Sequence, residues 1–169
     1  MKELAEYCVP AASVGAAAGL VAGGLAAFAG RPVGWSVLSG LGLGVPLILF
    51  GSGYAVLVAL GKVPAGVFAP AAVYWAIAFP LALLVHGITT VWLVTGTPGL
   101  PVDPWKFLAF RALVSMGFAI GFLWMHDQIA RFWWPRILDH NRYANRTVTQ
   151  YHNLSTTLQA RKAATGRKS

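Results

Sequence analysis

Four long apolar stretches divide the chain, and short segments rich in glycine, proline or charge separate them. Residues 7–30, 32–61 and 63–102 contain no Asp, Glu, Lys or Arg. A fourth stretch, 107–125, contains one charged residue, Arg111. About 20 helical residues cross a bilayer core that is about 30 Å thick, so every stretch is long enough for one membrane span.

Helices are the structure that such stretches form in lipid. Backbone polar groups must be paired within the segment or around a closed barrel, and these stretches lack the alternation of a barrel strand. We therefore predict an all-α, polytopic membrane protein. Its four-transmembrane-helix bundle has spans near residues 9–29, 36–60, 68–94 and 106–126.

Glycine and proline place the breaks between the spans. Gly30-Arg31-Pro32 and Gly61-Lys62-Val63-Pro64 are typical turn sequences, and Asp103-Pro104 is a typical helix start. Pro46 and Pro80 fall inside the second and third spans, where we expect kinks because each removes a helical hydrogen bond.

The composition supports a membrane location. Hydrophobic residues make up 57% of the 169 residues and charged residues only 11%, against about 25% charged in a typical soluble domain. This composition excludes an ordinary soluble domain and a disordered tail, and with no known binding motif we expect no nucleic-acid partner.

Positive charge gathers at the carboxyl-terminal end. The net charge is +8, and 8 of the 13 Lys and Arg residues follow residue 130. We therefore divide the chain into a transmembrane domain, 1–130, and a short basic, amphipathic interfacial or cytoplasmic tail, 131–169. The positive-inside rule then places both termini on the cytoplasmic or equivalent side of a bacterial or organellar inner membrane.

The tail contains a second helix pattern. Val148, Tyr151, Leu154 and Leu158 lie on one face of a helix expected at 141–162. That face lies on the membrane surface or docks on a partner, or the helix is solvated and partly frayed; residues 163–169 are expected to be flexible. The candidate contacts with anionic lipids or a partner are Arg131, Trp133, Trp134, Arg136, Arg142 and Arg146.

Small residues recur at helical spacing in the first two spans. Gly15, Gly19 and Gly23 form two GxxxG steps, and Gly40 and Gly44 form another. Such steps let two helix backbones approach closely. They favour packing within the bundle, and packing against a separate subunit is the alternative.

Two ionisable residues lie within the apolar spans. His86 and Arg111 are expected at similar depth in the outer leaflet, where they could face one cavity and hold a phosphate, a carboxylate or a quinone oxygen. Alternatively, Arg111 extends to the interface and His86 bonds a neighbouring helix.

The sequence predicts no cofactor and no metal site. Haem would need a second histidine in the membrane. The remaining candidates are His126-Asp127, Asp139-His140 and His152, whose spacing fits no metal motif. We interpret them as surface residues at the inner interface.

These features favour a non-catalytic accessory subunit of a larger integral membrane complex, whether respiratory, photosynthetic or lipid-transporting. Its expected partners are other integral membrane subunits and anionic lipids. The alternative is an oligomeric transporter of small molecules or lipids with Arg111 and His86 lining its cavity. A membrane enzyme that shares its active site with another chain is a third hypothesis.

Overall fold

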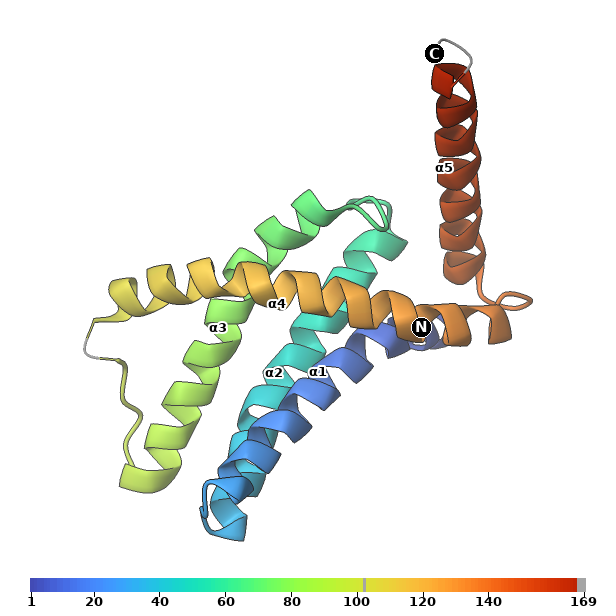
Figure 1. Cartoon of the computed structure of the whole chain (residues 1–169). Coiled ribbons are helices and arrows are strands. Elements are labelled where there is room, and N and C mark those ends of the chain that lie inside the picture. Colours follow the sequence, from blue (N-terminus) through green and yellow to red (C-terminus); the bar gives the residue numbers. More distant parts are fainter. Residues whose placement is uncertain (102, 167–169) are drawn as a thin grey trace.

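The computed structural model describes residues 1–101 and 103–166, with side chains as far as Thr157 except Leu154. In this part of the chain every regular element is a helix (Figure 1). In chain order these are α1 (Lys2–Phe28), α2 (Val33–Ala59), α3 (Phe68–Thr95), α4 (Pro104–Trp133), the 3₁₀ turn η1 (Trp134–Arg136) and α5 (Arg142–Gly166).

The predicted all-α four-helix bundle is confirmed. α1 to α4 are each long and apolar enough to cross a membrane, and the predicted spans coincide with them. The main differences are at the first and fourth spans: α1 begins at Lys2 instead of residue 9, and α4 ends at Trp133 instead of residue 126. Pro46 and Pro80 lie inside α2 and α3, which continue through both residues.

Glycine brings α1 and α2 together along their length. A methyl group on Gly15 would lie 2.4 Å from the backbone nitrogen of Ile48, and one on Gly19 would lie 2.7 Å from Cα of Gly44. Gly23 meets the Gly40 backbone one turn further along. The five glycines therefore pack within the chain, as an antiparallel pair of helices whose backbones touch.

Aromatic side chains join α3 to α4. Trp75 is fully buried, and its ring centroid lies 4.5 Å from that of Phe122. One helical turn further on, Phe79 stacks on Phe118 with centroids 4.5 Å apart. These pairs fix the antiparallel register of the two helices, and aromatic contacts of this kind add to the stabilisation from burial.

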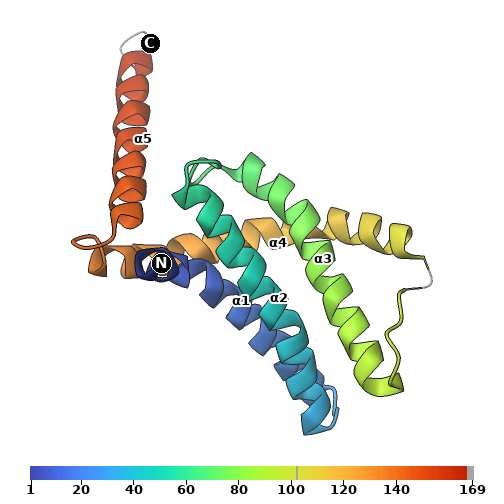
Figure 2. The ribbon, with the colours of Figure 1, turned by 180° about the vertical axis from the view of Figure 1, so that it is seen from behind.

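α4 crosses the other helices obliquely (Figures 1 and 2). Its amino terminus follows the expected start signal, because the Asp103 side chain accepts a hydrogen bond from the backbone of Lys106 and Pro104 occupies the first turn. The ammonium group of Lys106 lies 2.9 Å from the Asp103 carboxylate. These interactions with Lys106 hold the pKa of Asp103 below its usual value.

The amino terminus, the α2–α3 loop and α5 lie at one end of the bundle, here called the α5 end (Figures 1 and 2). The α1–α2 turn and the end of α3 lie at the opposite end.

α5 is longer than expected and is docked on the chain itself. It runs to Gly166, so 163–166 are helical instead of flexible, and 167–169 fall outside the described residues. Its buried face is formed by Ala144 and Thr147, with Val148 and Tyr151 partly buried against the core. Leu154 and Leu158, predicted for the same face, have side chains outside the described set.

Candidate functional site

His86 and Arg111 occupy matching positions in the α3–α4 register. Each lies seven residues from the Phe79–Phe118 stack, in opposite chain directions. The two helices diverge in that direction, and the end of α3 lies well apart from the start of α4 (Figure 1). Matching register therefore does not make them neighbours.

The two side chains have different surroundings. Nδ1 of His86 lies against α2, 2.7 Å from where a methyl group on Gly42 would be. The Arg111 guanidinium lies over Phe107 and Phe110 of its own helix, 5.3 and 5.9 Å from the ring centroids. Nδ1 of His86 and Nε of Arg111 are both buried without a hydrogen-bond partner among the described residues.

The predicted lipid or partner contacts divide into exposed and internal residues. Trp134 is only 4% exposed, because it stacks on Tyr7 and contacts His126, so it offers little surface to lipid or a partner. Trp133 is half-buried and donates a hydrogen bond from its indole to the Glu6 carbonyl at 2.7 Å. The four arginines in this set are exposed: Arg131, Arg136, Arg142 and Arg146.

The tail is tied to the amino terminus by hydrogen bonds. The Asn141 amide donates to the Glu3 carbonyl at 2.6 Å, and its side-chain oxygen caps α5 by accepting from two backbone N–H groups. His140 lies 2.9 Å from the Glu6 carboxylate, and the Tyr7 and Thr147 hydroxyls are 3.0 Å apart. These contacts connect the two predicted regions, 1–130 and 131–169.

A cluster of aromatic and polar groups that sequence reasoning missed lies beneath α5. His126 is 7% exposed, which corrects its interpretation as a surface residue, and its Nδ1 lies 3.2 Å from the Asp127 carboxylate. With Tyr54 and Tyr151 it lines a cavity of about 10 Å³, close to the space of one water molecule. Within the described residues no three His, Cys, Asp or Glu side chains gather to hold a metal.

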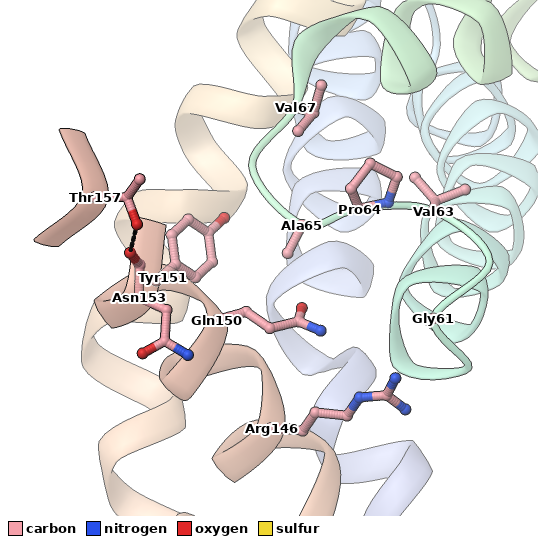
Figure 3. Close-up of a pocket in the computed structure, with 10 residues that line it drawn as sticks. All are labelled: Gly61, Val63, Pro64, Ala65, Val67, Arg146, Gln150, Tyr151, Asn153 and Thr157. Atoms are coloured by element: carbon pink, nitrogen blue, oxygen red, sulfur yellow. Dashed lines mark hydrogen bonds between the residues drawn. The ribbon is translucent and has the colours of Figure 1, made fainter. Parts of the chain in front are cut away.

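A larger cavity of about 700 Å³ lies between the α2–α3 loop and α5 (Figure 3). Arg146 and Gln150 reach from α5 toward the loop. The loop side is formed by residues from Gly61 to Val67. The cavity therefore combines polar groups from the tail with an apolar wall from the loop.

Glycine lets the loop approach α5. Gly61 and Gly66 both have positive φ, +71° and +70°. A methyl group on Gly66 would lie 2.7 Å from the Tyr151 ring, and one on Gly61 would lie 3.0 Å from the Arg146 guanidinium. Both positions therefore disfavour a side chain by conformation, and the Tyr151 ring also leaves no space for one at Gly66.

Two apolar grooves lie on the bundle itself. One, about 720 Å³, follows α3 and begins at Val63, which also lines the cavity beside α5. The other, about 670 Å³, follows the α1–α2 seam, and its lining includes Gly19, Gly23 and Gly24.

Comparison with known proteins gave no family to which this arrangement could be assigned: no family model, curated protein or solved structure matches the chain.

Proposed function

We propose that this protein is a non-catalytic accessory subunit of a larger integral membrane complex. The groove along the α1–α2 seam carries this proposal. Its floor is backbone, because glycines line it, and its rims are apolar side chains that include Leu20 and Leu41, which are 78% and 61% exposed. A surface of this shape admits a second helix at short backbone distance.

Gly24 shows that the groove has unused room. Unlike Gly15 and Gly19, it has no heavy atom within 4 Å of the position a side chain would take. A side chain at Gly24 would enter the groove, so this glycine leaves room there for another chain. In this proposal that chain is a transmembrane helix of a partner subunit, and the complex lies in a bacterial or organellar inner membrane with both termini on the cytoplasmic side.

Copurification in mild detergent tests the proposal. The full chain should purify with stoichiometric membrane partners. Gly24→Leu should fill the groove and reduce the recovered partner at least fivefold. Gly117→Leu is the matched control, because Gly117 on α4 is also open and lies outside the groove. Equal recovery with both variants, or wild-type protein that purifies without partners, would contradict the proposal.

One observation favours the transporter as a second candidate. Nδ1 of His86 and Nε of Arg111 are buried and have no hydrogen-bond partner among the described residues, so a polar substrate could supply one. Arg111→Leu distinguishes the two functions. A transporter loses transport while its assembly survives, whereas an accessory subunit keeps its function or loses its partner.

A further inference from the structure

We propose that the cavity between the α2–α3 loop and α5, together with the groove on α3, binds one phospholipid with an anionic headgroup. The proposal is independent of the accessory-subunit function, which rests on the α1–α2 seam. It rests on a polar cavity and an apolar groove that meet at Val63.

The cavity lies at headgroup level. α2 ends at Ala59 and α3 begins at Phe68, so the loop that lines the cavity joins the ends of two spans. The 27 residues of α2 are about 40 Å long at 1.5 Å each, longer than the hydrocarbon core of about 30 Å. The loop therefore lies among the headgroups when α2 crosses the membrane.

The polar half of the site suits a phosphate. The Arg146 guanidinium reaches the loop at Gly61, and no described carboxylate lies within ion-pair distance of it. Gln150 points the same way one turn later, and exposed Lys62 follows Gly61 in the loop. Arginine binds phosphate oxygens through two parallel N–H groups. The described residues that line the cavity include no acidic residue.

The apolar half suits an acyl chain. The groove is lined by one face of α3 and by Phe50 of α2: the α3 residues are Ala69, Pro70, Val73, Tyr74, Ile77, Ala78 and Leu81. From Ala69 to Leu81 the helix rises about 18 Å, close to the half-thickness of the bilayer core, about 15 Å. The Tyr74 hydroxyl donates to the Phe50 carbonyl at 2.6 Å, so the groove presents no unpaired phenol to the chain.

The cavity beside α5 continues into the groove on α3, and this continuity identifies the ligand as a lipid. A soluble phosphate would occupy only the cavity beside α5, and a purely apolar molecule would occupy only the groove. A phospholipid places its headgroup by Arg146 and its chain past Val63 along α3. Anionic lipids are enriched in the cytoplasmic leaflet, which is the side assigned to the α5 end.

Native mass spectrometry of the detergent-purified full chain tests this site. The probes are phosphatidylglycerol and phosphatidylcholine with identical acyl chains. We expect one retained phosphatidylglycerol per chain and at least fivefold less phosphatidylcholine. Arg146→Gln should lower phosphatidylglycerol retention about fivefold, as expected for one interfacial cation. The control Arg31→Gln makes the same charge change at an exposed residue of the α1–α2 turn, outside the cavity, and should change retention less than twofold.

A second variant tests the acyl half without altering charge. Ile77→Trp fills the groove at a residue that is 62% exposed, and should lower retention of both lipids. Leu113→Trp is its control, because Leu113 is 74% exposed on α4 and lies outside the groove. Unchanged phosphatidylglycerol retention in Arg146→Gln, equal retention of the two lipids, or displacement of the lipid by excess glycerol phosphate would each overturn the proposal.

Discussion

Tyr7 of α1 and Trp134 of η1 stack with ring centroids 5.3 Å apart and planes only 9° from parallel. The pair connects α1 and η1 to α5, because the Tyr7 hydroxyl also forms a hydrogen bond with Thr147 and the Trp134 ring contacts Tyr151. The first turns of the chain thus hold its last helix in place.

Substitutions at Tyr7 should loosen α5. Tyr7→Ala removes a side chain that is 1% exposed, at a cost of about 3–5 kcal/mol for a buried aromatic residue. Tyr7→Phe keeps the stacked ring and loses only the hydrogen bond to Thr147, which should lower the stability by about 1 kcal/mol. Hydrogen–deuterium exchange of residues 142–151 in detergent should be fast in Tyr7→Ala and near wild type in Tyr7→Phe. Equal protection in both variants would contradict a tether through the ring.

The α1–α2 contact should tolerate methyl groups at one glycine and not at another. Gly15→Ala forces a methyl group against the backbone of Leu47 and Ile48, so the helices must separate, with an expected loss of about 1–3 kcal/mol. Gly24→Ala meets open space and replaces glycine with the better helix former, so it should be neutral or stabilising. The thermal stability of each variant can be measured as the fraction of protein that is still monodisperse by gel filtration after heating. Equal thermal stability would show that the backbones are not in contact.

Asn141 should have two separable functions. Asn141→Ala removes the α5 cap and the bond to Glu3, and a lost cap alone costs about 1 kcal/mol. Asn141→Asp keeps the cap acceptor but cannot donate to the Glu3 carbonyl. Amide exchange at Tyr143 and Ala144 should accelerate in Asn141→Ala and stay slow in Asn141→Asp. Fast exchange in both would assign the protection to the Glu3 bond instead.

Docking of α5 should weaken in alkali through Tyr151. Burial, and then the nearby Asp127 carboxylate, raise the pKa of the Tyr151 phenol above its ordinary value of about 10. The folded state therefore favours the neutral phenol. The stability that the neutral phenol contributes to the folded state is fully present below pH 10 and declines as the pH rises above that value. The phenol can be followed by titrating the absorbance at 295 nm in the wild type and in Tyr151→Phe and subtracting the second curve from the first. The difference should show no ionisation step near pH 10, and a full step there would contradict burial of this phenol.

The sequence predicted the bundle because span signals are local. Charge-free runs such as 32–61 and the Asp103-Pro104 start are readable without any tertiary information. The start of α1 at Lys2 was missed, since its charged first turn carries no span signal. In the structure that turn contacts the tail, because the Glu6 and Glu3 carbonyls accept hydrogen bonds from Trp133 and Asn141.

The site was only partly predictable. Arg146, which lines the cavity beside α5, was marked by its charge, but the docking face of α5 depends on Ala144 and Thr147, small residues that an apolar periodicity does not mark. Trp134 and His126 were expected at the surface and are buried. Trp134 stacks on Tyr7 of α1, and His126 shares a small cavity with Tyr54 of α2 and Tyr151 of α5. The pairing of the α2–α3 loop with α5 rests on Gly61 and Gly66, whose partners only the fold reveals.

The most direct test of the account is the sidedness of two positions. Cys8 is the chain's one cysteine and is buried, so a Cys8→Ser background can carry a single new thiol at an exposed site, Thr97→Cys after α3 or Ser155→Cys on α5. A membrane-impermeant maleimide applied to intact cells should label Thr97→Cys and should reach Ser155→Cys only after permeabilisation. Labelling of both positions from the same side would contradict the four-span membrane bundle.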